Sequence, residues 1–366
     1  MVYKAIGLMS GSSLDGLDII FAHFHDQAGT WSFEIRAADC YGYTAEWEER
    51  LRSATDLPAR EYLLLHTRYG RYLAENVLRF MEEKNIQLQA DLIASHGHTT
   101  FHAPWQGMTA QLGDGAVLAA ETNMAVVSDL RALDVALGGQ GAPIVPVGEK
   151  LLFPEYDLFL NLGGIANISA HGMDGVTAFD ICPANRVLNA LARQLNKPYD
   201  DKGAWAAQGQ VNENLLGDLN ALEYYEKPWP KSLANEFSTR TVLPLLDGHV
   251  LSIQGKLRTY TAHIVLQTAK AAKRILAASP AGGDHKLLVT GGGAFNTFLV
   301  DRLRERLAPL NVTLVVPPDE VIKFKEALIM ALLGVLRWRE NNTTLASVTG
   351  ARRDAIGGAL WMGQEG

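Results

Sequence analysis

The chain has 366 residues and a formal net charge of −7, with 48% hydrophobic and 20% charged residues. A chain of this length exceeds what one hydrophobic core usually serves, so we expect two domains, or one divided domain with a cleft. The composition excludes a disordered or fibrous protein, and the net negative charge argues against a broad surface for nucleic acid.

The first part of the chain is predicted to form a hairpin-led sheet. Strands are expected near residues 3–8, 17–24 and 31–40, with a Gly/Ser turn between the first two. Residues 58–84 carry apolar side chains at three- and four-residue steps, which is typical of a long amphipathic helix. The next expected elements are a strand at 91–95, a helix at 115–122 and a strand at 125–128.

A domain boundary is predicted where the sequence becomes dense in Gly and Pro. The segment 137–146 reads LGGQGAPIVP, which suits a crossing between lobes. We therefore predict an N-terminal lobe over residues 1–135, a C-terminal lobe over 136–345, and a segment 346–366 that packs back near the N-terminal lobe.

A second sheet is predicted beyond this boundary. Residues 156–170 repeat the strand, glycine turn and strand that open the chain. Strands then alternate with helices, which favours an α/β fold of two related lobes. The later elements are expected as strands at 176–179, 286–289 and 312–315, and as helices from 183 and at 259–278, 297–307 and 325–339.

The turn at residues 9–18, MSGSSLDGLD, has the composition of a phosphate-binding loop. Gly11 and Gly16 permit positive φ, so successive N–H groups can point into a concavity. The hydroxyls of this turn and the carboxylates of Asp15 and Asp18 suit a metal-bound phosphate. The alternative is a polar hairpin connection, because Ser, Gly and Asp are common turn residues.

Two later glycine turns extend this pattern. Gly163 and Gly164 lie between two apolar strands, where the backbone can approach a ligand closely or simply form a tight β-turn. Gly291, Gly292 and Gly293 join a strand to a helix, and the N–H groups at that helix start can bind a nucleotide. The alternative there is an ordinary strand-to-helix turn.

Three charged residues are candidates for substrate chemistry. Asp180 ends a short strand just before a helix, so it is either a general base or a cap of that helix. Arg131 precedes a glycine cluster and can bind a substrate carboxylate, or it pairs structurally with Asp134. Glu326, at the start of the last long helix, either interacts with the helix dipole or reaches into the cleft.

The segment SHGHTTFH supports a rival interpretation. His96 and His98 alternate on an extended segment and His102 follows, so the three could bind zinc in a hydrolase. No carboxylate or cysteine stands at an obvious ligand spacing nearby, and histidines in a pocket wall often only donate hydrogen bonds to a polar ligand.

The remaining features bear on the compartment. Cys40 and Cys182 are too few for a disulfide scaffold and lack the spacing of a zinc motif. The N-terminus reads as a strand and not as a signal peptide, and the longest apolar run is too short to cross a bilayer. We therefore expect a cytoplasmic protein without membrane or nucleic-acid partners.

Taken in order, these motifs resemble the anhydro-N-acetylmuramic acid kinase family over nearly the whole chain. The segments that carry the resemblance are MSGSSLDGLD, SHGHTTFH, QLGDG, DVALGGQGAPIVP, LNLGGIANIS, FDICPAN, TGGGAFN and FKEALIMALL. The resemblance implies a two-lobed, actin-like ATPase fold of the ribonuclease H-like class with a central cleft. It also implies ATP and Mg²⁺ as cofactors, an anhydro amino sugar as substrate, a homodimer, and a role in recycling cell-wall sugars.

The resemblance also implies roles for individual residues. Asp180 matches the catalytic aspartate that activates water for attack on the anomeric carbon, while the freed O6 takes the γ-phosphoryl group. His96, Arg131 and Glu326 match positions that bind the sugar, with Arg131 at its lactyl carboxylate, and no protein metal ligand is assigned. The residues expected to bind ATP are Gly11, Ser12, Ser13, Leu14, Asp15, Gly16, Leu17, Asp18, Gly163, Gly164, Gly291, Gly292 and Gly293.

This chain departs from the family pattern at three places. Asp180 is followed by ICPAN where Thr-Gly-Pro-Gly-Asn is usual, His98 stands where Gln is more common, and Ser12 stands where Thr is common. Without these two glycines, the loop can adopt fewer backbone conformations, because other residues rarely adopt positive φ. The alternative functions are a zinc-dependent hydrolase that uses the three histidines, and a non-catalytic nucleotide-binding module of the same fold.

Overall fold

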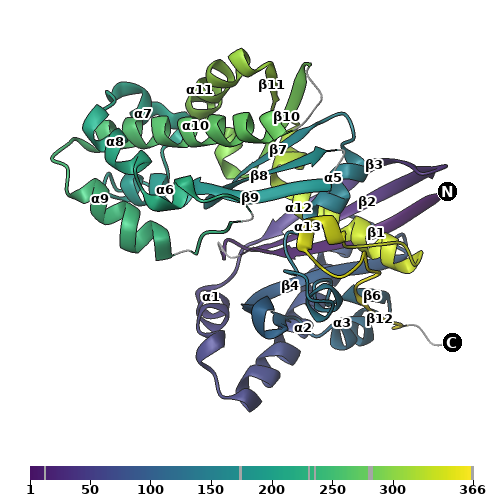
Figure 1. The fold of residues 1–366 in the computed structure, drawn as a ribbon. Helices are drawn as coiled ribbons and strands as arrows, with labels where there is room; N and C mark the ends of the chain where they lie inside the picture. The colour runs from purple at the N-terminus through teal and green to yellow at the C-terminus, as the bar shows by residue number, and fades with distance from the viewer. Residues whose placement is uncertain (12–13, 173–174, 230, 235, 279–282, 364–366) are drawn as a thin grey trace. The chain divides into compact units, whose positions relative to one another are not determined.

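The computed structural model describes residues 1–366 except 12–13, 173–174, 230, 235, 279–282 and 364–366. The chain forms two compact units (Figure 1). The first comprises residues 1–154 and 324–366, and the second comprises residues 155–323. These bounds differ from the predicted ones at 135/136 and 345/346. Helix α5 (Val145–Leu152) packs on strand β3 (Thr30–Tyr41), so residues 145–152 belong with the first unit.

The first unit is built on a mixed sheet. Its strand order is β12-β6-β4-β1-β2-β3, with β5 paired to β4. Strands β1, β2 and β3 are antiparallel neighbours, whereas β1, β4 and β6 run parallel. The strands of this unit are β1 (Val2–Ser10), β2 (Leu17–Gln27), β3 (Thr30–Tyr41), β4 (Leu92–Ala103), β5 (Met108–Leu112), β6 (Ala125–Ser128) and β12 (Ala359–Trp361).

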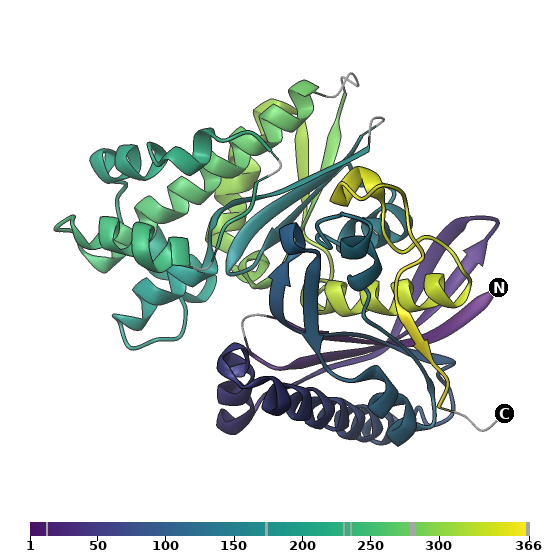
Figure 2. The same ribbon diagram turned by 60° about the horizontal axis from the view of Figure 1, so that its bottom comes forward.

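Helices cover both faces of this sheet. One face of β1 packs against α2, where Tyr69, Leu73 and Val77 lie in the same buried cluster as Ile6 and Leu8. The other face packs against the part of α12 that belongs to this unit, where Gly7 lies close to Ala327 and Ala331 (Figure 2). The helices of this unit are α1 (Ala45–Arg52), α2 (Ala59–Glu83), α3 (Gly115–Thr122), α4 (Ala132–Ala136), α5 (Val145–Leu152), α12 (Asp319–Trp338) and α13 (Ala346–Thr349).

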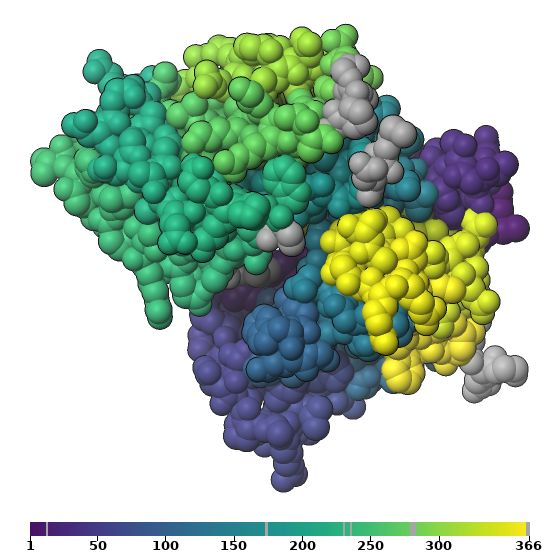
Figure 3. Space-filling model, in the orientation of Figure 1, coloured from purple at the N-terminus to yellow at the C-terminus, as the bar shows by residue number. Residues whose placement is uncertain are grey.

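The C-terminal segment is part of the first unit. Strand β12 pairs antiparallel with β6, and the backbone of residues 349–352 exchanges hydrogen bonds with Leu137 and Gln140. In Figure 3 this yellow segment lies on the surface against the blue part of the same unit. Within the described ranges, no helix combines the length and apolarity of a membrane span.

The second unit repeats the plan of the first. Its strand order is β11-β10-β7-β8-β9, so the first three strands form an antiparallel meander, and β10 and β11 add in parallel beside β7. Five strands of the first sheet, in the order β6-β4-β1-β2-β3, match this order, and β5 and β12 are additions to the first sheet. The shared connectivity confirms the predicted α/β class of two related lobes with an actin-like, ribonuclease H-like plan. The strands are β7 (Leu158–Leu162), β8 (Ile165–Gly172), β9 (Gly175–Pro183), β10 (His285–Thr290) and β11 (Val312–Val315).

Helix α10 is the central helix of the second unit. Its buried face contributes Tyr260, Ile264 and Ala272 to the same core as Ile168 of β8 and Leu287 of β10. The helices of this unit are α6 (Asn185–Arg193), α7 (Ala204–Gln208), α8 (Glu213–Asn220), α9 (Leu243–Asp247), α10 (Ile253–Ala278) and α11 (Thr297–Leu307).

The close packing of β1 on α12 leads to a stability prediction. A Cβ at Gly7 would clash with the carbonyl oxygen of Ala327 and lie 2.8 Å from the backbone nitrogen of Ala331. Backbone atoms of a packed helix cannot move aside cheaply, so Gly7→Ala is expected to destabilise the protein by about 3 kcal/mol or more. Gly217→Ala is the control, because Gly217 lies in helix α8 with no atom near its Cβ position. It is expected to stabilise by about 0.5–1 kcal/mol. Denaturant unfolding measures both, and equal stabilities would contradict this packing.

Candidate functional site

The first turn lies between β1 and β2 of the first unit. Its Ser12 and Ser13 lie outside the described residues. Gly16 does not adopt positive φ, contrary to the expectation, but a Cβ there would lie 2.7 Å from the Tyr41 carbonyl oxygen and 2.8 Å from Cys40 Sγ. Leu14 has a φ of 61°, and its N–H donates to the Gly11 carbonyl at 3.3 Å. The close approach of the backbone to β3, and not a left-handed conformation, therefore explains why residue 16 is a glycine.

Asp18 is the carboxylate of this turn with the most perturbed environment. It follows Leu17, whose backbone pairs with both neighbouring strands. Burial raises the pKa of Asp18 to about 6, against an opposing hydrogen bond with Cys40, and the charges of Glu326 and Asp15 add to the rise. In such surroundings the ionised carboxylate is destabilised, and a bound cation would stabilise it.

Asp18→Asn is expected to change the pH dependence of stability. The carboxyl titrates near pH 3.8 when unfolded and near pH 6 when folded, so between these values only the folded state keeps the proton. Wild-type stability relative to the variant therefore falls as pH rises through this window. Above it, without nucleotide or Mg²⁺, the variant is expected to be more stable by on the order of 1–3 kcal/mol. Denaturant unfolding at pH 4.5 and 7.5 measures this. The expectation is contradicted if the difference in unfolding free energy between the variant and wild type is no larger at pH 7.5 than at pH 4.5.

A buried chain of hydroxyl groups runs from β1 to α2. Tyr43 OH donates to Ser10 Oγ at 2.7 Å and lies 2.5 Å from Tyr69 OH. Ser10 Oγ in turn lies 2.9 Å from His98 Nδ1. If Ser10 donates to Nδ1, the neutral ring of His98 carries its proton on Nε2. Burial lowers the pKa of His98 to about 4, so the ring is neutral at physiological pH.

His96 and Arg131 form a pair that orients the arginine. The Nδ1 of His96 donates to the Gly97 carbonyl at 2.9 Å, so its Nε2 is the acceptor for Arg131 Nε, also at 2.9 Å. Burial lowers the pKa of His96 to about 3, and the charge of Arg131 adds to this shift. Arg131 Nη1 also donates to the Gly141 carbonyl at 2.6 Å. The guanidinium is therefore fixed by a neutral histidine and by the glycine-rich segment.

The glycine-rich segment 138–141 is closely held within the first unit. Asp134 is fully buried, and its Oδ2 accepts from the Gly141 N–H at 2.7 Å while its Oδ1 accepts from Thr349 Oγ1 at 2.7 Å. Arg131 and Asp134 thus contact the same segment through different atoms, and not as a direct ion pair with each other. The role of Arg131 in binding a substrate carboxylate stays a prediction.

Glu326 lies in the second turn of α12, because that helix begins earlier than predicted, at Asp319. Burial raises the pKa of Glu326, while Lys325 and Arg131 oppose that rise. The neighbouring Lys325 forms a buried ion pair with Glu149 at 2.7 Å. Glu326 therefore shares an electrostatic environment with Arg131 and Asp18, so the first unit groups three residues from distant parts of the sequence.

Asp180 is the central polar residue of the second unit's candidate site. It lies within β9 and does not cap the next helix, since α6 begins after Ala184 without a side-chain cap. Its Oδ2 accepts from the Leu233 N–H at 2.8 Å, and its backbone N–H donates to the Lys231 carbonyl at 3.2 Å. Burial raises the pKa of Asp180 despite the hydrogen bond from Leu233, which makes its carboxylate a stronger base than an exposed one.

The two glycine turns of the second unit lie side by side because β7 and β10 are parallel neighbours. Gly291 has a φ of 79°, and a Cβ there would clash with Asn161 Oδ1. A Cβ on Gly293 would lie 2.6 Å from Leu162 Cβ. A Cβ would meet no close atom at Gly292 or at the pair Gly163–Gly164. The carbonyls of Gly163 and Gly164 accept hydrogen bonds from the backbone N–H groups of residues 184–186, at the start of α6. Asn185, which the sequence analysis did not single out, donates from Nδ2 to the Leu162 carbonyl at 2.8 Å.

The histidine cluster does not have the geometry of a zinc site. Both ring nitrogens of His96 are already used, and His102 Nδ1 pairs with Thr109 Oγ1 at 3.1 Å. Over the described part of the chain, no group of three His, Cys, Asp or Glu side chains is placed to hold a metal ion. His96 and His98 thus act as hydrogen-bonding partners of Arg131 and Ser10, and His102 as a partner of Thr109.

Comparison with known proteins identifies the family to which the chain is similar. The family model described as anhydro-N-acetylmuramic acid kinase matches residues 3–363. Two curated relatives carry the name anhydro-N-acetylmuramic acid kinase. The one from Shewanella woodyi is 33% identical over 374 residues, covering 97% of this chain and 98% of the relative. The one from Coxiella burnetii (strain Dugway 5J108-111) is 34% identical over 383 residues, covering 99% and 98%.

Solved structures give weaker likenesses. An activator of 2-hydroxyisocaproyl-CoA dehydratase from Clostridium difficile with bound ADPNP is 14% identical, covers 92% of this chain and 96% of its own, and has a TM-score of 0.47. A ROK family glucokinase from Streptomyces griseus in complex with glucose and AMPPNP is 11% identical, with coverage of 90% and 98% and a TM-score of 0.39.

Proposed function

Because the chain belongs to the anhydro-N-acetylmuramic acid kinase family, we propose that it couples hydrolysis of the 1,6-anhydro bridge of anhydro-N-acetylmuramic acid to phosphorylation of O6. It is an ATP-using kinase of this family. The product of the proposed reaction is N-acetylmuramic acid 6-phosphate, which suits a role in recycling cell-wall sugars. The observation that carries the mechanism is Asp180, whose carboxylate is partly buried, has a raised pKa and is oriented by the Leu233 N–H.

The proposed reaction couples two displacements, one at the anomeric carbon and one at the γ-phosphorus of ATP. Water attacks the anomeric carbon, and Asp180 takes the proton that the water loses. The bond between that carbon and O6 breaks, and O6 keeps the electron pair. O6 then attacks the γ-phosphorus of ATP, and ADP leaves. The proton on Asp180 returns to solvent, so sugar, water and ATP give sugar 6-phosphate, ADP and one proton.

The substrate-binding roles belong to the first unit. Arg131 presents a guanidinium held by His96 and Gly141, so it is pre-organised to pair with the lactyl carboxylate of the sugar. Glu326 would accept a hydrogen bond from a sugar hydroxyl. The turn of residues 11–18 in the first unit is proposed to bind ATP phosphates. The glycine turns at 163–164 and 291–293 in the second unit are likewise proposed to bind ATP.

Mg²⁺ fits the chemistry of the carboxylates near that turn. Asp18 has a pKa raised by burial and by the charges of Glu326 and Asp15, which favours a nearby cation. Carboxylate oxygens are also the protein ligands that Mg²⁺ prefers. Asp18 and Asp15 would hold the ion, directly or through water, and when bound the ion neutralises charge on the phosphates.

An ADP-release assay with a panel of sugars tests the function. Purified chain with Mg-ATP is expected to release ADP at a rate that anhydro-N-acetylmuramic acid raises strongly, whereas N-acetylmuramic acid, which has no anhydro bridge, gives little stimulation. ADP release that no sugar stimulates would contradict the proposal and favour a non-catalytic nucleotide-binding module. The family also implies a cytoplasmic homodimer, and light scattering on the purified chain tests the dimer.

A further inference from the structure

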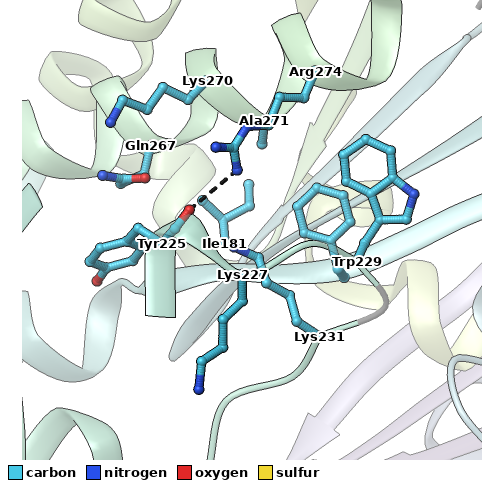
Figure 4. Close-up of a pocket in the computed structure, with 10 residues that line it drawn as sticks. Ile181, Tyr225, Lys227, Trp229, Lys231, Gln267, Lys270, Ala271 and Arg274 are labelled. Carbon is cyan, nitrogen blue, oxygen red and sulfur yellow. Dashed lines mark hydrogen bonds between the residues drawn. The ribbon is translucent and has the colours of Figure 1, made fainter. Parts of the chain in front are cut away.

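A small basic pocket lies in the second unit beside β9 (Figure 4). It lies between strand β9, helix α10 and the segment after the short helix η4 (Glu223–Glu226). The enclosed volume is about 20 Å³, enough for roughly one water molecule or a small polar group, and the pocket opens outward from there. It is lined by Phe179, Ile181, Tyr225, Lys227, Trp229, Lys231, Gln267, Lys270, Ala271 and Arg274.

The lining residues include four cations and no acid. Two of the cations have glutamate partners outside the lining, both at 3.4 Å: Arg274 with Glu226, and Lys227 with Glu223. Both ion pairs are largely exposed, so solvent screens them. Lys231 donates to the Tyr224 carbonyl at 3.2 Å, and Lys270 has no ion pair among those found between described residues. About two positive charges are therefore left without a carboxylate.

Ring stacking and hydrogen bonds hold part of the pocket wall. The rings of Phe179 and Trp229 stack 5.5 Å apart and nearly parallel. Gln267 is almost fully buried, and its Nε2 donates to Asn220 Oδ1 at 2.7 Å. Arg274 Nη1 donates to the Tyr225 carbonyl at 3.2 Å, which fixes the guanidinium at the edge of the pocket (Figure 4). A ligand would find these groups already in place, which lowers the entropic cost of binding.

We propose that the mouth of this pocket binds the phosphate group of a small phosphate monoester, with one phosphate oxygen in the enclosed space. A phosphate monoester carries close to two negative charges at neutral pH, which matches the two unpaired cations better than the single charge of a carboxylate. The lysines supply point charges for the phosphate, and Arg274, whose two terminal nitrogens already bind the Tyr225 carbonyl and Glu226, adds positive charge at the edge of the pocket. The rest of the ligand would lie at the open side, beside the exposed edge of Trp229.

The pocket also adjoins the residue proposed as the general base, so this part of the inference rests on the proposed function. Tyr224 OH donates to the Asp180 carbonyl at 2.6 Å, and the Lys231 carbonyl and the Leu233 N–H bind the backbone and carboxylate of Asp180. A phosphate that binds Lys231 would hold this same segment. Occupancy of the pocket is therefore expected to stabilise the hydrogen bond from Leu233 to Asp180.

Calorimetric titration of the full chain tests the site. The ATP site is first saturated with a non-hydrolysable ATP analogue and Mg²⁺, and glucose 6-phosphate, inorganic phosphate, acetate and glucose are then titrated separately. We expect one equivalent of each phosphate to bind, and acetate and glucose to bind at least tenfold more weakly. Lys270→Glu is expected to weaken phosphate binding at least tenfold.

Lys273→Glu is the matched control. It lies on the same helix, is exposed, makes the same charge change and does not line the pocket, so it is expected to leave phosphate binding within about twofold. Equal weakening by Lys270→Glu and Lys273→Glu, or acetate binding as tight as phosphate, would overturn the proposal. So would the absence of phosphate binding to the wild-type chain. Lys227→Gln, at an exposed side chain, replaces Lys270→Glu if the latter fails to fold.

Amide hydrogen exchange gives a second readout that does not need turnover. Saturating glucose 6-phosphate is expected to slow exchange in residues 224–233 of the wild-type chain but not of Lys270→Glu. Unchanged exchange in the wild-type segment would contradict the coupling to Asp180. Failure of the proposed kinase mechanism would leave the phosphate titration unchanged, so the two hypotheses fail separately.

Discussion

Asp180→Asn is expected to lower turnover of anhydro-N-acetylmuramic acid by about 10²–10⁴-fold, the range typical of losing a general base. The amide is close in size to the carboxylate, and its oxygen can still accept from the Leu233 N–H, so the local fold is expected to survive. Affinity for an ATP analogue should stay within a few-fold of wild type. Sugar-stimulated ADP release and analogue titration measure the two quantities.

The control for this variant is Asp301→Asn, at an exposed carboxylate on α11 whose ion-pair partner within the described residues is Arg304. It is expected to keep full activity. A fully active Asp180→Asn would remove Asp180 from the mechanism, whereas loss of analogue binding in that variant would point to a structural role. The wild-type rate should also fall at acidic pH, because protonation of Asp180, whose pKa burial raises, removes the base.

Arg131→Lys is expected to raise the KM for anhydro-N-acetylmuramic acid by about 10–100-fold, with a smaller change in kcat. Lysine keeps the charge but loses the fork that contacts His96 and Gly141 at the same time. A hydrogen bond to a charged group contributes about 1.5–3 kcal/mol, which corresponds to this range. Steady-state kinetics over a range of sugar concentrations measures the effect.

A second substrate distinguishes loss of carboxylate recognition in Arg131→Lys from disruption of the local structure. Anhydro-N-acetylglucosamine has no lactyl carboxylate, so its kcat/KM should be nearly the same for wild type and Arg131→Lys. Arg71→Lys, at an exposed arginine that pairs with Glu121, serves as the control and should change neither substrate. If both substrates lost the same factor in Arg131→Lys, Arg131 would position the segment 138–141 and would not recognise the carboxylate.

Much of the fold followed from hydrophobic periodicity. The hairpin-led sheets, the long helix α2 and helices α3 and α11 form where their apolar spacing predicts them. The elements that were not predicted are short. Strand β5 has five residues and gains its order from pairing with β4, and β12 has three residues and pairs with β6. Such elements depend on tertiary contacts that a local pattern does not contain.

The glycine-rich segment 137–146 shows why the predicted boundary differs from the observed one. Its composition is that of a linker, yet Asp134, Arg131 and Thr349 hold it by buried hydrogen bonds within the first unit. The partner Thr349 lies more than two hundred residues away in sequence. No local signal distinguishes a solvated glycine loop from one that is fixed in this way.

The candidate site was predictable where chemistry is local. The glycine turns at 163–164 and 291–293 were predicted, and the pairing of β7 with β10 brings them together. The hydroxyl chain through Tyr43 and Tyr69 was not predicted, because tyrosines at helical spacing read as core residues. The contact of Asp180 with Leu233 was also not predicted, since it joins segments about fifty residues apart with no motif between them.

The source of the oxygen atoms in the product tests the central claim most directly. The purified chain is incubated with Mg-ATP and anhydro-N-acetylmuramic acid in water enriched in ¹⁸O, and the sugar is reduced at once with borohydride to prevent exchange at the anomeric carbon. Coupled hydrolysis and phosphorylation predicts one ¹⁸O atom at C1 and none in the phosphate of the 6-phosphate product. A phosphorylated sugar that still contains the anhydro bridge, or ¹⁸O in inorganic phosphate without labelled sugar, would contradict the mechanism.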